Sequence, residues 1–259
     1  MLDLPAVAEP EDELGRVEGE ALWPNRFPSK VLKRTRMQIG SAAWTSLYQQ
    51  KPAALEGVVF KRNWWHYYTA ATLPPRFESI LISLDTAFKV GTSNDYSVGL
   101  VLGVAANGYF VLDLMRGRYA FPALERQVLA LAERWKPERI LLEDKASGMS
   151  LLQTLRLNSR LPIVPVPVDT DKLSRAHAVT ALVETGNVLL PEAAPWLADF
   201  LDEVSSFPAA PHDDQVDALT QVLNFVSAEG REPPILGFLS RAGLAPRTIP
   251  RITRRSRTR

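Results

Sequence analysis

The chain has 259 residues, of which 46% are apolar and 23% charged, and its net charge is +1, as expected of a globular protein rather than a disordered one. It contains no cysteine, which excludes disulfides, thiolate zinc sites and cysteine nucleophiles, and only three histidines, which argues against a histidine-rich zinc site. Any bound metal ion is therefore expected to be held by carboxylates, which favours Mg²⁺ or Mn²⁺.

The sequence of the first 76 residues predicts a disordered N-terminus followed by a connector segment. Residues 1–20 are acidic and polar, which predicts disorder, and they lack the basic start and apolar centre of a signal peptide. Residues 21–76 are rich in aromatic side chains and read as a connector segment that packs on the following domain, with helix expected over 28–40 and again over 42–50. No apolar run reaches the roughly 20 residues that span a bilayer, so no membrane partner is expected.

Residues 77–228 show the alternation of strands and helices that is typical of an α/β domain. An Asn-Gly pair at 107–108 joins two apolar runs and predicts a β-hairpin. Residues 163–168 contain two prolines, which suggests a strand at the edge of the sheet. Strands are expected, in chain order, over 79–86, 96–105, 109–114, 139–142, 163–168 and 188–190; helices are expected over 121–135, 147–159, 172–185, 196–204 and 213–227.

This order predicts the fold class. An antiparallel hairpin followed by helix–strand alternation gives a mixed central sheet flanked by helices on both faces, which is the order of an RNase H-like core. We expect the first and fourth strands to be neighbours in that sheet.

Acidic residues stand at the ends of the predicted elements. Asp85 ends the first strand, Glu143 and Asp144 end the fourth, and Asp213 and Asp214 begin the last helix. Strand ends and helix starts meet at one edge of an α/β sheet, so these carboxylates are expected to converge. Converging carboxylates repel one another, and two divalent ions that relieve the repulsion would catalyse phosphodiester hydrolysis.

Each acid also has a plainer interpretation when it is taken alone. Asp85 could cap a turn, and Glu143 with Asp144 could be a solvated strand end. Asp213 and Asp214 could be the N-cap and first-turn acids that favour any helix start. Only their combination in this element order favours a catalytic site.

Positive charge is concentrated at the C-terminal end, in a tail that spans residues 229–259. Without six of its arginines the net charge would fall from +1 to −5. Such a tail favours a polyanion through counterion release, although it could also be a solvated end with no specific role. We predict DNA contact by Arg247, Arg251, Arg254, Arg255, Arg257 and Arg259.

Several segments together resemble the C-terminal nuclease half of the large terminase subunit of tailed bacteriophages and prophages. The most specific segment reads HDDQVDAL at 212–219, and the similarity covers about residues 16–228. The other matching segments read ISLDTA at 82–87, SNDYS at 93–97, LLEDKASG at 141–148, LWPNRF at 22–27 and SLYQQKP at 46–52.

The resemblance implies an RNase H-like endonuclease that uses two divalent ions, Mg²⁺ or Mn²⁺, to cut concatemeric double-stranded DNA during genome packaging. It implies that Asp85 is the bridging ligand, Glu143 the second, and Asp213 or Asp214 the third. It implies weaker metal ligation by Asp95 and Asp144 and positioning of a phosphate or water by His212. For Asp217 a structural role is expected. Gly148 would let the following helix begin close to the metal site, although it could equally be a plain turn glycine.

The resemblance also implies partners and a location. The portal protein, the small terminase subunit and a separate ATPase domain are expected partners, in the cytoplasm of the bacterial host. The chain departs from the family in having no GxxxxGK[ST] phosphate-binding loop, so it lacks the ATPase. Two alternatives stay open: another RNase H-like nuclease, such as a junction resolvase or an RNA–DNA hybrid nuclease, and a non-catalytic DNA-binding or portal-docking module.

Overall fold

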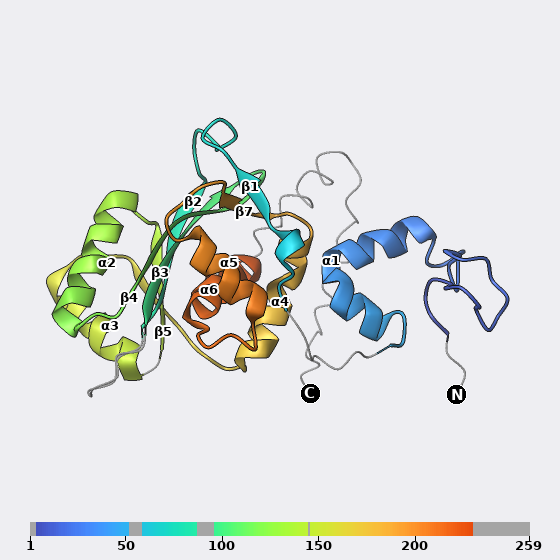
Figure 1. Cartoon of the computed structure of the whole chain (residues 1–259). Helices are drawn as coiled ribbons and strands as arrows, with labels where there is room; N and C mark the ends of the chain where they lie inside the picture. The colour runs from blue at the N-terminus through green and yellow to red at the C-terminus, as the bar shows by residue number, and fades with distance from the viewer. Residues whose placement is uncertain (1–3, 52–58, 87–95, 145, 230–259) are drawn as a thin grey trace, which may run out of the picture.

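A computed structural model of the chain describes residues 4–51, 59–86, 96–144 and 146–229 (Figure 1). The strands are β1 (His66–Tyr68), β2 (Ser79–Asp85), β3 (Ser97–Ala105), β4 (Gly108–Gly117), β5 (Arg139–Glu143), β6 (Ile163–Val166) and β7 (Val188–Pro191). The helices are α1 (Ser29–Leu47), α2 (Phe121–Trp135), α3 (Ala146–Asn158), α4 (Lys172–Glu184), α5 (Leu197–Ser206) and α6 (Asp214–Ala228), with a 3₁₀ turn, η1 (Arg62–Trp64).

The strands form one mixed sheet in the order β1-β7-β4-β3-β2-β5-β6. The hairpin of β3 and β4 turns through Ala106 and Asn107, because Ala105 pairs with Gly108. Strand β6 lies at an edge, as its prolines predicted. Strands β2 and β5 are parallel neighbours, which confirms the expected contact between the first and fourth predicted strands.

Helices cover both faces of the sheet, and side chains that alternate along each strand divide the core between them (Figure 1). On β2, Leu81 packs in the cluster shared with α4, α5 and α6, whereas Ile82 and Leu84 pack in the cluster shared with α2 and α3. All nine residues of β3 are buried, which explains its continuous apolar sequence. The fold is thus the predicted mixed sheet flanked by helices.

The end of the connector is part of this core. Phe60 and Trp65 are buried among the residues beneath α4, α5 and α6, and the Trp65 ring meets Phe200 of α5 edge-on at 5.8 Å. Three connector residues also form β1, which pairs in parallel with β7. These residues therefore pack on the domain, as expected of the connector. The sequence did not predict β1, because a strand of three residues is too short to show alternation.

Residues 4–22 have a defined path, although the sequence predicts disorder over 1–20. Val7 pairs with Ala21. The Asp12 carboxylate accepts hydrogen bonds from the backbone N–H of Leu14 and from the Arg16 side chain, so acidic residues here close a turn instead of leaving the chain solvated. Composition alone does not reveal such local pairing.

Helix α1 bends at Gly40, whose φ of 77° and ψ of 168° break the helix where the sequence predicted a gap between two helices. The bend lets α1 pack on α4: the backbone N–H of Ser41 donates to Glu184 Oε2 at 2.8 Å. A Cβ at Gly40 would lie 3.2 Å from the Cβ of Ala181. None of the described helices is long and apolar enough to cross a membrane.

Candidate active site

Strands β2 and β5 end side by side with an acid each. Their last paired residues are Leu84 and Leu142, so Asp85 and Glu143 follow at the same level of two adjacent parallel strands. Side chains alternate along a strand, so Asp85 shares a face with Leu81 and Glu143 with Leu141, both of which lie on the α4–α6 side. Glu143 is only 7% exposed.

Helix α6 is fixed against the same two strands by Gln221. Its side-chain amide donates to Ser83 Oγ at 2.8 Å and lies 3.4 Å from the carbonyl oxygens of Leu84 and Leu141. Asp217 and Asp213 precede Gln221 by one and two helical turns and therefore share its side of α6. The start of α6 thus brings acids toward the strand ends of Asp85 and Glu143.

Two cations of α4 lie among these acids. The Lys172 ammonium group contacts Asp213 Oδ1 at 2.8 Å and Asp217 Oδ2 at 2.6 Å. Arg175 Nη2 donates to Asp217 Oδ1 at 2.7 Å and lies 3.6 Å from Glu143 Oε1. Burial alone would lower the pKa of Lys172, but its hydrogen bonds to Asp213 and Asp217 outweigh that effect and raise the pKa.

Asp214 has a different set of neighbouring charges. Burial, and next the charges of Glu203 and Asp213, raise the pKa of the Asp214 carboxyl above its ordinary value, against the opposing charges of His212 and Arg116. Asp213 therefore belongs to the ion network with Glu143, while the charges that act on Asp214 include Glu203 of α5 and Arg116 of β4.

The donor set suits a hard divalent ion, because carboxylate oxygens are its preferred ligands. Among the described residues, however, no three acidic or histidine side chains are already grouped at metal-binding spacing. Lys172 and Arg175 form ion pairs with Asp213, Asp217 and Glu143 and balance part of their negative charge. These carboxylates suit a divalent ion by their chemistry and by their position at one edge of the sheet.

Gly148 allows α3 to begin against the end of β5. A Cβ at this position would lie 2.3 Å from the backbone oxygen of Glu143, closer than any real contact. The close approach predicted for Gly148 is present, and the contact is with the candidate ligand residue itself.

The remaining predicted positions are dispersed or lie outside the described residues. Asp144 is exposed, and its backbone N–H donates to Val166 O at 2.9 Å. His212 is exposed and meets the Tyr96 ring edge-on at 5.0 Å. Asp95 and the arginines of the tail (Arg247, Arg251, Arg254, Arg255, Arg257 and Arg259) lie outside the described residues.

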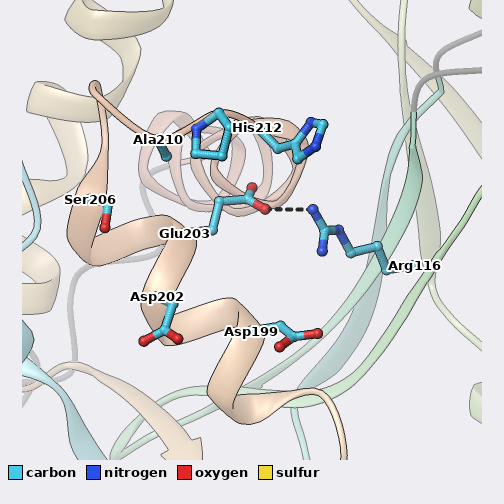
Figure 2. Close-up of a pocket in the computed structure, with 8 residues that line it drawn as sticks. Arg116, Asp199, Asp202, Glu203, Ser206, Ala210 and His212 are labelled. Atoms are coloured by element: carbon cyan, nitrogen blue, oxygen red, sulfur yellow. Dashed lines mark hydrogen bonds and ion pairs between the residues drawn. The ribbon is translucent and has the colours of Figure 1, made fainter.

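A hollow of about 380 Å³ opens beside the start of α6, between α5 and β4 (Figure 2). Glu203 lies on its wall and is held by three donors: the Gln215 backbone N–H at 2.7 Å, the Gln215 amide at 2.6 Å and Arg116 Nη2 at 3.0 Å. The hollow is lined by Arg116, Asp199, Asp202, Glu203, Ser206, Ala210, Pro211 and His212.

Two arginines stack on Tyr96, one in β4 and one directly after it. The guanidinium carbon of Arg116 lies 4.0 Å from the ring centroid and that of Arg118 lies 4.6 Å from it. Arg116 is paired with Glu203, whereas Arg118 is exposed and has no carboxylate partner within the described part of the chain. Stacking therefore holds an exposed positive charge near His212 and the start of α6.

The sequence interpretation missed Lys172, Arg175 and Arg118. One signal was available for the first two: they stand three residues apart in the first turn of a helix, where the helix dipole disfavours cations. Cations at that position need nearby acids, and only the tertiary structure identifies them.

Comparison with known proteins connects this arrangement to a family. A profile of the terminase RNase H-like domain matches residues 82–225. That range is more than half of the chain, and it includes the acids at the ends of β2 and β5 and at the start of α6. A comparison with curated proteins finds no match.

Solved structures of two phage terminases share the fold. The large terminase of a thermophilic bacteriophage matches with a TM-score of 0.58 at 12% identity, over 76% of this chain and 52% of that one. The large terminase nuclease of a second thermophilic phage, G20c, with bound magnesium matches with a TM-score of 0.50 at 18% identity, over 65% of this chain and 97% of that one. This chain thus spans about half the length of the first of these proteins. The profile match and the shared fold agree, and the chain belongs to the terminase RNase H-like domain family.

Proposed function

We propose that this chain is the nuclease part of a large terminase subunit, a metal-dependent endonuclease that cuts concatemeric double-stranded DNA during genome packaging. One observation carries the proposal: Asp85 and Glu143 follow adjacent parallel strands on one face of the sheet, and α6 begins with acids directed toward that edge. Membership of the terminase RNase H-like family supports DNA as the substrate.

The proposed ion-holding residues are Asp85, Glu143 and Asp213, with Asp214 next to Asp213 as a further oxygen donor. Two bound Mg²⁺ or Mn²⁺ ions would activate a water and stabilise the leaving oxygen of a phosphodiester. The all-carboxylate donor set supports a hard ion, and the G20c nuclease, which shares the fold, was solved with magnesium.

The chain's own residues would then orient the DNA. Arg118 is an exposed cation held on the Tyr96 ring at the α6 end of the sheet, and a backbone phosphate is its natural partner. His212 meets the same ring and is exposed beside Asp213, which suits the phosphate- or water-positioning role expected of it. The C-terminal arginines, Arg247 to Arg259, would add sequence-independent contacts with DNA.

The proposed partners follow from how much of a terminase this chain represents. It spans about half the length of the first matching large terminase, and an ATPase domain is the first proposed partner. The portal protein and the small terminase subunit are the other proposed partners, in the cytoplasm of the bacterial host.

The test is cleavage of supercoiled plasmid in Mg²⁺, Mn²⁺ or EDTA by the wild type, Glu143→Gln and Asp85→Ala. We expect cutting only with metal, reduced at least ~100-fold in both variants because each removes a proposed ligand. Glu133→Gln is the control: it removes an exposed acid of α2, on the opposite face of the sheet, and should retain most of the activity.

The second candidate function is a non-catalytic DNA-binding module. The observation that favours it is that Lys172 and Arg175 already form ion pairs with Asp213 and Asp217, so these carboxylates have positive partners without a metal ion. That function predicts a folded protein that binds DNA equally with metal or EDTA and cuts in neither. Cutting of branched DNA or RNA–DNA hybrids in preference to linear duplex would instead indicate a resolvase or hybrid nuclease.

A further inference from the structure

Asp217 is fully occupied by cations. One carboxylate oxygen accepts from Arg175 at 2.7 Å and the other contacts Lys172 at 2.6 Å, and the residue is only 5% exposed. Both oxygens are therefore used inside the protein. Asp217 serves as the anchor of the two cations, which is a structural role.

The two cations differ in how firmly they are held. The Arg175 side chain is 14% exposed, and besides Asp217 it donates to Thr170 O at 2.9 Å. The Asn224 amide also fixes the Arg175 backbone oxygen at 3.0 Å. The Lys172 side chain is 43% exposed, and it contacts the carboxylates of Asp213 and Asp217. Arg175 is a fixed part of the fold, whereas Lys172 has solvent on one side and a flexible stem.

We propose that Lys172 is the internal counterion of the acidic edge: its ammonium group occupies the Asp213 carboxylate in the ion-free protein, and a divalent ion displaces it. The inference rests on the proposed function, because it takes Asp213 as an ion-holding residue. Lys172 would keep its contact with Asp217 after the exchange and turn its charge toward solvent.

Charge balance explains why such a residue is present. Without Lys172, Asp213 and Asp217 would stand one turn apart at the start of α6, and Arg175 would still pair with Asp217 and Glu143. Like charges at this spacing destabilise a helix and the packing around it. Lys172 thus stabilises the ion-free fold and competes with the metal ion for the same oxygen, and the two effects are coupled.

The test measures Mn²⁺ affinity of the full chain without DNA, by the electron paramagnetic resonance signal of the free ion. Lys172→Met keeps the aliphatic stem and removes the competitor, so we expect Mn²⁺ to bind about three- to fivefold more tightly, the effect of losing a half-exposed ion pair. The same variant should melt at a lower temperature in EDTA, and Mn²⁺ should raise its melting temperature by more than it raises that of the wild type.

Two controls separate the local effect from net charge. Lys172→Arg keeps a cation at the site and should retain wild-type affinity to within about twofold. Arg126→Ala removes one exposed positive charge from α2, on the opposite face of the sheet, and should leave the affinity unchanged.

The outcomes distinguish this inference from the proposed function. If the wild type binds no Mn²⁺, both are overturned; if it binds Mn²⁺ and Lys172→Met binds equally or more weakly, only the counterion role is overturned. If the Lys172→Met variant does not fold, a second experiment uses the wild type. Its lysines are acylated with and without Mn²⁺, and mass spectrometry measures how much each lysine is labelled. Mn²⁺ should then increase the labelling of Lys172 but not of Lys30 or Lys33 on α1, and unchanged labelling of Lys172 would overturn the proposal.

Discussion

Neighbouring residues at the start of α6 have separate surroundings because successive side chains on a helix point about 100° apart. Asp213 meets Lys172, whereas Asp214 lies near Glu203 and has a raised pKa because it is buried beside like charges. The sequence interpretation could not choose between these two acids. Asp213 is linked to Glu143 through the ion pairs of Lys172, Asp217 and Arg175, which is why we propose Asp213 as the third ligand and Asp214 as a further donor.

Gly148→Ala tests the contact between α3 and the end of β5. The added Cβ would lie 2.3 Å from the Glu143 backbone oxygen, so the strand end must shift. We expect a loss of about 1–3 kcal/mol in the free energy of unfolding, measured with urea, and weaker Mn²⁺ binding. Met149→Ala, at the exposed next position, should change neither by much. A stable Gly148→Ala variant with wild-type Mn²⁺ affinity would mean that this approach does not position Glu143.

Arg118→Gln tests the proposed phosphate contact. Loss of one cation should weaken DNA binding about three- to tenfold for any sequence, and the slope of log affinity against log salt should fall by about one. Fluorescence anisotropy of a labelled duplex in EDTA measures both. Arg126→Gln, on α2, is the matched control, and equal effects of the two substitutions would remove any special role for the stack on Tyr96.

At the scale of elements, short segments complete the sheet that carries the site. Strand β1 pairs with β7 at the edge of the sheet, and the hydroxyl of Tyr68 donates to Val111 O of β4 at 2.9 Å. The Tyr68 ring also packs on Phe110 at 5.4 Å. The connector is thus attached to the sheet by hydrogen bonds and by aromatic contacts.

Tyr68→Phe tests this attachment through its pH dependence. Burial, with a smaller effect of Asp113, raises the pKa of Tyr68 to about 12 from its ordinary value of 10. The protonated phenol therefore contributes stability that is complete below about pH 10 and is lost as the pH rises toward about 12.

At neutral pH the substitution should cost about 1 kcal/mol in unfolding free energy, the value of one hydrogen bond. The difference between wild type and variant should shrink between about pH 10 and 12 in thermal unfolding. Tyr67→Phe, at the exposed neighbouring position, should show no such trend; a constant difference for Tyr68→Phe would contradict the role of the buried phenol.

At the scale of the whole molecule, the N-terminal part divides into two pieces with different roles. Residues around α1 form their own small cluster of Ala21, Leu32 and Trp44. Phe60 and Trp65, in contrast, belong to the main core beneath α4, α5 and α6. The boundary that matters for folding therefore lies before Phe60, within the predicted connector of residues 21–76.

Two truncated chains test this division. A chain that begins at residue 59 keeps Phe60, Trp65 and β1, and should unfold cooperatively when heated. A chain that begins at residue 78 loses two large buried aromatic side chains and exposes Phe200, a loss of several kcal/mol that should abolish cooperative unfolding. Circular dichroism during heating measures both, and equal stability of the two would show that the connector is dispensable.

The sequence by itself determined most of the elements, though not β1, and the candidate acids. Apolar periodicity and turn residues act locally, so they were enough to predict the bounds of α2, the bend at Gly40 and the hairpin at Asn107. The element order and the HDDQVDAL segment indicated the family that the profile match confirms.

Only the tertiary structure decided which cations pair with the acids at the start of α6. Lys172 and Arg175 look like ordinary helix residues until α4 and α6 pack together, and β1 has no pattern until β7 lies beside it. Such contacts join residues far apart in the chain, and their energies depend on distance and burial, which a linear pattern does not contain.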